Sequence, residues 1–142
     1  MSNDPGHVPD GPELALLWAA QSVVTEVNTR MDAGDLEGAL DLYAEDAVLQ
    51  AVRGKPAIHQ TMLHSSAAGA GKPACHVVTN VRAAVDGDAV VVQCTLIAYL
   101  LDGPRPYGAN AVLNVRYVLK QSAAGNLRII EQRVEGYDLT YA

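Results

Sequence analysis

The sequence predicts an α+β fold: a cone-shaped, curved antiparallel β-sheet wrapped by three N-terminal helices. Two observations support this prediction. About seventy residues of mainly helical pattern come first, and long strand patterns joined by tight turns then fill the rest of the chain. A sheet and a helical layer bury their apolar faces against each other, so a curved sheet wrapped by its own helices forms a cone that is open at one end. The order of elements therefore predicts a pocket for a small molecule.

Size and charge limit the classes of protein. The chain has 142 residues, 49% hydrophobic and 18% charged, which is enough for the core of one domain. We expect residues 1–11 to form a flexible tail and residues 12–142 the single domain. The net charge is -6 and the basic residues are scattered, so no nucleic-acid partner is expected. The sequence has no apolar run of about 18 residues and no signal-peptide pattern, which favours a cytoplasmic protein without a membrane segment.

The first helix is predicted to start at Pro12, because its apolar positions then recur every three or four residues. Gln21 and Asn28 are polar exceptions on this apolar face. The helix should end near Asp32, because Gly34 can adopt the left-handed conformation that closes a helix. A carboxylate in the last turn meets the negative end of the helix dipole, which is mildly unfavourable. Asp32 is therefore a candidate functional residue.

The next elements follow from capping and turn residues. Asp35 can cap a second short helix that continues to Tyr43. Residues 47–52 have the pattern of a short strand, and Gly54 and Pro56 introduce a third helix. Four strands then form an antiparallel meander, at residues 75–85, 89–101, 109–121 and 127–138.

The strand at residues 89–101 is apolar on both of its alternating faces. Helices can cover one face, but the chain supplies too few helices for both. We therefore expect a homodimer that buries the open face around Val91, Ile97 and Val112.

The two cysteines are predicted to be free thiols. A hairpin centred on Gly87 sets Cys75 opposite Tyr99 and Cys94 opposite Asn80. The sulfurs then lie about five residue pairs apart along the strands, too far for a disulfide.

Several segments resemble the SnoaL-like branch of the nuclear transport factor 2-like superfamily. They are residues 31–35 (MDAGD), 39–48 (ALDLYAEDAV), 53–58 (RGKPAI), 76–81 (HVVTNV) and 127–134 (LRIIEQRV). The resemblance covers Leu14 to about Asp138 and implies the α+β cone. The superfamily includes scytalone dehydratase, steroid isomerase and polyketide cyclases, together with non-catalytic members and accessory subunits.

The resemblance also implies site residues. In the dehydratases, an aspartate on the first helix and a histidine on the first long strand form an acid/base pair, and these positions match Asp32 and His76. An asparagine on the penultimate strand of scytalone dehydratase matches Asn114. Two positions depart from the pattern: the tyrosine that many relatives carry before the aspartate is Val27, and the second histidine of scytalone dehydratase falls near Tyr99 or Leu100.

Each candidate residue has a structural alternative. His76 suits proton transfer near neutral pH, or lies on a solvated sheet edge. Asp32 orients His76, or is the polar end of a helix. Tyr99 donates to a ligand carbonyl, and Trp18 serves as a substrate shelf, or both belong to the core.

Register around the turn at residues 122–126 predicts two cross-strand pairs. Asn114 is expected opposite Arg133, where both could line the cavity and bind a carbonyl or oxyanion. Arg116 is expected opposite Glu131, as a surface ion pair.

The sequence and the resemblance together favour a lyase or isomerase of the dehydratase, steroid isomerase or polyketide cyclase type. It would use cofactor-free acid/base catalysis on an apolar small molecule with a carbonyl. The alternative is a non-catalytic ligand-binding protein or accessory subunit with the same cone. No metal site is expected, because His59 and His64 do not share a helix face, and no cofactor-binding motif is present.

Overall fold

The computed structural model describes residues 4–102 and 108–135. Its helices are α1 (Gly11–Asp32), α2 (Leu36–Leu40) and α3 (Lys55–Ser65). Its strands are β1 (Tyr43–Leu49), β2 (Val52–Arg53), β3 (Ala74–Asp86), β4 (Ala89–Leu100), β5 (Ala111–Gln121) and β6 (Leu127–Val134). The predicted last strand extended to residue 138, and its final residues lie outside the described part of the chain.

The strands form one six-stranded sheet in the order β2-β1-β6-β5-β4-β3. The four strands from β3 to β6 are the predicted antiparallel meander. The sheet is not wholly antiparallel, however, because β1 runs parallel to β6. These two strands are far apart in the sequence, so no hairpin forces them to run in opposite directions.

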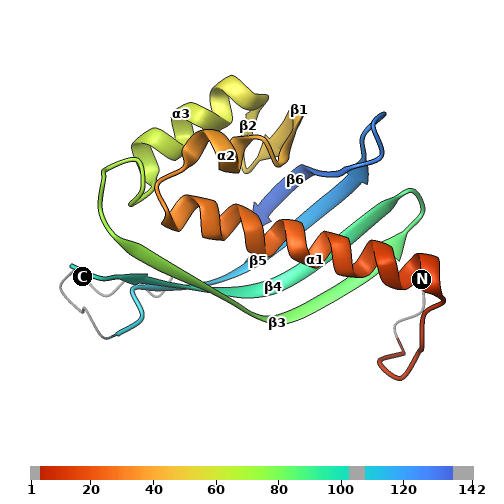
Figure 1. Ribbon diagram of the computed structural model, residues 1–142. Helices are drawn as coiled ribbons and strands as arrows, with labels where there is room; N and C mark the ends of the chain where they lie inside the picture. Colours follow the sequence, from red (N-terminus) through yellow and green to blue (C-terminus); the bar gives the residue numbers. More distant parts are fainter. Residues whose placement is uncertain (1–3, 103–107, 136–142) are drawn as a thin grey trace.

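The three described helices lie on one side of the curved sheet, as Figure 1 shows. Helix α1 packs across β3 and β4, and α3 packs against β1 and α2. We call the helix-covered side the inner face and the opposite side the outer face. The predicted α+β cone is confirmed, with the core between the helices and the inner face.

Helix α1 begins at Gly11, one residue before the predicted start at Pro12, and ends at Asp32 as predicted. Its N-cap is Asp10, whose carboxylate accepts a hydrogen bond from the Glu13 backbone N–H at 2.7 Å. At the other end Gly34 has a φ of 78° and donates to the Met31 carbonyl at 3.0 Å. A second bond from the Asp35 N–H to the Arg30 carbonyl completes a Schellman motif.

Helix α2 is shorter than predicted. Asp35 caps it as expected, accepting from the Gly38 N–H at 2.9 Å, but the helix ends at Leu40. Tyr43 instead begins β1 and pairs with Ile129, so strand pairing overrides the helical pattern. The strand predicted at residues 47–52 is replaced by β1 and the two-residue β2, with Gln50 in the intervening turn.

A β-bulge interrupts β3. The predicted pair of Cys75 with Tyr99 is confirmed, but the register shifts between Thr79 and Arg82. Asn80 adopts a φ of 52° there, which is unusual for a residue other than glycine. Because an extra residue exchanges the two faces of a strand, Arg82 lies on the outer face, opposite Gln93. The predicted pair of Cys94 with Asn80 falls inside this bulge, where Asn80 and Val81 together lie opposite Cys94 and no regular pair forms.

A second bulge near Ile130 shifts the pairing of β5 with β6. Arg116 lies opposite Arg133, so the predicted pairs of Asn114 with Arg133 and of Arg116 with Glu131 are wrong. The Arg116 to Glu131 ion pair still forms along the diagonal, at 3.4 Å. The extra residue in the bulge accounts for the error.

Candidate functional site

A cavity of about 460 Å³ lies between the helices and the inner face of the sheet. It lies within the size range of small-molecule sites, roughly 300 to 1,000 Å³. Helix α1, the end of α3 and strands β3 to β6 all contribute to its wall. Much of the wall is apolar, including Val27, Met31, Met62, Leu96 and Leu113.

Asp32 and His76 meet at the wall of this cavity. The Asp32 Oδ1 atom lies 2.5 Å from His76 Nδ1, and Asp32 Oδ2 accepts from the His76 backbone N–H at 2.7 Å. Their side chains are 20% and 24% exposed, so both are shielded but still reachable. One carboxylate therefore holds both the ring and the backbone of the histidine.

The local fold explains how the two residues come together. Asp32 is the last residue of α1, and the Schellman motif that follows fixes where the helix ends. His76 is the third residue of β3, before the bulge, and pairs with Ala98 on β4. Its side chain is thereby directed to the inner face, toward the end of α1.

This contact assigns the histidine tautomer on chemical grounds. A carboxylate oxygen can only accept, so the Nδ1 atom of His76 carries the hydrogen. Among the described residues, nothing forms a hydrogen bond with the Nε2 atom. The ring can therefore exchange a proton through Nε2 while Asp32 holds it.

Further polar residues line the cavity, and sequence reasoning did not select them as site residues. Four of them form two side-chain hydrogen bonds with one another, and we call these four, Asn28, Tyr43, Tyr117 and Gln132, the polar floor. The Tyr43 hydroxyl bonds to Gln132 Oε1, and Asn28 Nδ2 lies 3.4 Å from the Tyr117 hydroxyl. Burial raises the pKa of both tyrosines above its ordinary value, so both keep their protons. Asn28 was visible in the sequence only as a polar exception on an apolar helix face.

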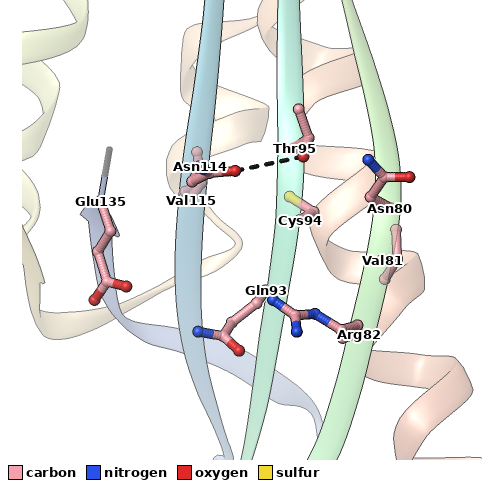
Figure 2. Close-up of a pocket in the computed structure, with 9 residues that line it drawn as sticks. All are labelled: Asn80, Val81, Arg82, Gln93, Cys94, Thr95, Asn114, Val115 and Glu135. Atoms are coloured by element: carbon pink, nitrogen blue, oxygen red, sulfur yellow. Dashed lines mark hydrogen bonds between the residues drawn. The ribbon is translucent and has the colours of Figure 1, made fainter. Parts of the chain in front are cut away.

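The other predicted site residues lie away from this cavity. Asn114 is exposed on the outer face and bonds to Thr95, as Figure 2 shows, with α1 behind the sheet. Tyr99 pairs with Cys75, and strand alternation places it on the same outer face. A cavity-lining role for Asn114 and Tyr99 is therefore ruled out by the alternation of the strands.

Arg133 and Trp18 also lie outside the cavity. Arg133 is exposed and its Nε atom lies 3.0 Å from Glu131 Oε1. Trp18 is 71% exposed on α1 and cannot form a shelf inside the cavity. The apolar helix face predicted around Trp18 faces the core only in part.

The outer face has a separate, open groove of about 670 Å³. Figure 2 shows that polar side chains of three strands dominate it, among them Arg82, Gln93, Thr95 and Asn114. Glu135 lies at its other side, beyond β6. The groove contains none of the residues that surround the Asp32 and His76 pair.

Charge and donor atoms further define the cavity. Among the described residues that line it, Asp32 is the one carboxylate and none is a lysine or arginine. Within the part of the chain that the structure describes, no three His, Cys, Asp or Glu side chains converge as metal ligands. None of the described helices is long and apolar enough to cross a membrane.

Comparisons with known proteins agree with this architecture. The SnoaL-like domain family matches residues 12–131, whereas no curated protein matches the chain. Rv3472 of Mycobacterium tuberculosis, a protein of unknown function solved as an Asp-to-Asn variant, is 19% identical. The match covers 87% of this chain and 77% of that one, with a TM-score of 0.74.

Two other solved structures are similar. A Catenulispora acidiphila protein in complex with S-DNPA is 21% identical over 87% of this chain and 94% of that one, with a TM-score of 0.70. A Novosphingobium aromaticivorans protein described as a candidate scytalone dehydratase is 14% identical over 91% and 89%, also with a TM-score of 0.70. These identities indicate a shared fold, which a further match describes as nuclear transport factor 2-like. The chain belongs to the SnoaL-like domain family and has the nuclear transport factor 2-like fold.

Proposed function

We propose that this protein is an enzyme of the dehydratase, isomerase or cyclase type. It acts by cofactor-free acid/base catalysis on a neutral, mostly apolar molecule that carries a carbonyl group. The observation that carries the proposal is the double contact of Asp32 with His76 at the wall of a 460 Å³ cavity. A catalytic base needs this arrangement, a ring held in one tautomer with its second nitrogen open to the ligand.

The proposed proton transfers follow from this geometry. His76 Nε2 removes a proton from the carbon beside the substrate carbonyl, and the electron pair moves onto the carbonyl oxygen as an enolate. Asp32 stabilises the imidazolium that forms, because its carboxylate already accepts from Nδ1. The imidazolium then returns the proton to another carbon in an isomerisation, or to a departing hydroxyl in a dehydration.

The charge of the site supports a neutral substrate. A substrate carboxylate or phosphate would meet Asp32 without a lysine or arginine among the described lining residues. The apolar side chains of the wall instead suit a hydrocarbon ring system. Asn114 and Tyr99 do not polarise the carbonyl, because both lie on the outer face.

The comparisons support the same class. The family match and a fold neighbour described as a candidate scytalone dehydratase are consistent with lyase chemistry. The neighbour solved with S-DNPA is consistent with a small-molecule pocket in this fold.

The test uses β-tetralone, a neutral fused-ring ketone with acidic protons beside its carbonyl. Proton NMR in D₂O follows the exchange of these protons with and without the protein. We expect the wild type to accelerate exchange, and His76→Ala to lose the acceleration. The matched control is His64→Ala, since His64 is exposed on α3 and does not line the cavity. Binding of β-tetralone without any acceleration would contradict the proposal and favour a non-catalytic binding protein.

A further inference from the structure

The polar floor offers unused hydrogen-bonding atoms to the cavity, and their identity can be worked out from the contacts. Asn28 Nδ2 donates to the Val24 carbonyl at 2.9 Å and to the Tyr117 hydroxyl at 3.4 Å. A carbonyl only accepts, so the nitrogen of this amide is fixed and both of its hydrogens are used. Oδ1 of Asn28 has no partner among the described residues, and it is a free acceptor.

Gln132 offers the opposite polarity. Burial keeps the Tyr43 hydroxyl protonated, so this hydroxyl donates to Gln132 Oε1. The NH₂ group of Gln132 then remains as a donor, and none of the described residues accepts from it. Tyr117 has 0% of its surface exposed and its hydroxyl accepts from Asn28 Nδ2, so we assign it to supporting Asn28 instead of contacting a ligand.

The floor lies close to the catalytic pair. Asn28 and Asp32 are four residues apart on α1, so their side chains are about 6 Å apart on one face of the helix. Gln132 pairs across the strands with Tyr117, which Asn28 contacts. A ring bound against His76 Nε2 therefore lies within reach of one amide donor and one amide acceptor.

We propose that Gln132 donates a hydrogen bond to the substrate carbonyl oxygen and that Asn28 accepts one from a substrate hydroxyl. The substrate class is then a neutral, ring-containing hydroxy ketone. This assignment rests on the proposed function for its chemical consequence, because a donor on the carbonyl oxygen also stabilises the enolate formed by His76. Recognition of the ketone itself does not require turnover.

The test compares three neutral ligands with one ring skeleton: tetralin, β-tetralone and a ring-hydroxylated β-tetralone. Their dissociation constants are measured by protein-observed NMR titration. We expect the wild type to bind β-tetralone about three- to tenfold more tightly than tetralin, the scale of one hydrogen bond. Gln132→Met should abolish this preference and leave tetralin binding unchanged.

The matched control is Gln93→Met, the same substitution on the outer face of the sheet. It should keep the ketone preference. Tyr43→Phe frees Gln132 to rotate, so it should reduce the preference without abolishing it. If Gln132→Met fails to fold, Tyr43→Phe decides: an unchanged preference in that variant overturns the assignment of Gln132.

A second arm tests Asn28. The ring-hydroxylated ligand should bind the wild type more tightly than β-tetralone, and Asn28→Leu should remove this gain. Absence of a ketone preference in the wild type, or its retention in Gln132→Met, would overturn the inference. His76→Ala should lose proton exchange but keep the ketone preference, so failure of the proposed function and failure of this inference give different results.

Discussion

The inner and outer faces of the sheet are built from alternate residues of the same strands but have different properties. On β4, Val92, Cys94 and Leu96 are buried on the inner face, while Gln93 and Thr95 between them face the outer groove. Buried polar groups on the inner face have defined partners, as in the polar floor. The outer face carries a larger hollow, yet most of its polar side chains, including Arg82, Asn114 and Glu135, are exposed. The comparison teaches that shielding and fixed partners, not hollow size, identify the site where chemistry is expected.

The largest expected effect is a loss of catalytic activity when residues of the inner-face cavity, but not of the outer face, are changed. Asp32→Asn and His76→Ala should each slow proton exchange of β-tetralone by about a hundredfold or more, the usual scale of acid/base catalysis. The double variant should be little worse than either single one, because both remove the same unit. NMR exchange rates measure this. The outer-face variant Asn114→Leu should exchange at the wild-type rate, and additive effects of the two cavity variants would count against the pair.

The same substitution on each face tests the difference in packing. Ile129 is fully buried on the inner face, so Ile129→Ala should lower the free energy of unfolding by about 2–5 kcal/mol. Ile97 is half-buried on the outer face, and Ile97→Ala should cost about 1 kcal/mol or less in the monomer. Urea denaturation measures both values. Equal losses would show that the outer face is covered as well as the inner face.

Alkaline pH should act on the inner-face thiol. Burial raises the pKa of Cys94 from 9.0 to about 11. The protonated thiol therefore makes its full contribution to the free energy of unfolding below pH 9. That contribution is lost as the pH rises from 9 to about 11. Denaturation measured from neutral pH to pH 11 should show this fall, and Cys94→Ala should reduce it. Cys75 is exposed, so a similar reduction in Cys75→Ala would refute the assignment to Cys94.

The smallest expected effect concerns the uncovered outer face. We propose, as the sequence predicts, that a second copy of the chain packs there. Arg82 and Glu135 lie on opposite sides of the outer groove, and within the described residues neither has an ion-pair partner. A two-fold axis between them would bring each Arg82 near the partner's Glu135.

Sedimentation velocity tests this packing. The wild type should sediment as a dimer, and Arg82→Glu or Glu135→Arg should weaken the dimer by no more than about fivefold, the scale of an exposed ion pair. The double charge swap should restore association. A monomeric species of 15.0 kDa at micromolar concentration would contradict the proposed dimer.

The sequence was informative where a local signal sets the structure. The end of α1 follows from Gly34, and the β3 to β4 hairpin follows from Gly87, which has a φ of 63°. The bulges did not disturb the prediction that Asp32 meets His76. Asp32 lies at the end of α1, and His76 precedes the bulge on β3. The unfavourable place of Asp32 at a helix C-terminus drew attention to that residue, but only the resemblance to a family paired it with His76.

The remaining errors have physical causes that local patterns do not contain. The bulges at Asn80 and Ile130 each add a residue to one strand, and that choice depends on the partner strand. The first bulge disrupted the predicted pairing of Cys94 with Asn80, and the second changed the partners of Asn114 and Arg116. The polar floor was missed because Tyr43 and Tyr117 are indistinguishable from core residues until their hydroxyl partners are known.

The bulge at Asn80 divides β3 into two segments whose side-chain alternation is out of phase. Sequence changes near the β3 to β4 hairpin can therefore alter the distal half without turning His76 away from the cavity. Deleting one residue at the bulge would bring the two halves into phase and leave Arg82 on the outer face, opposite Gln93. Straightening the strand without a deletion would instead turn the Arg82 guanidinium toward α1, where burial of the charge would oppose folding.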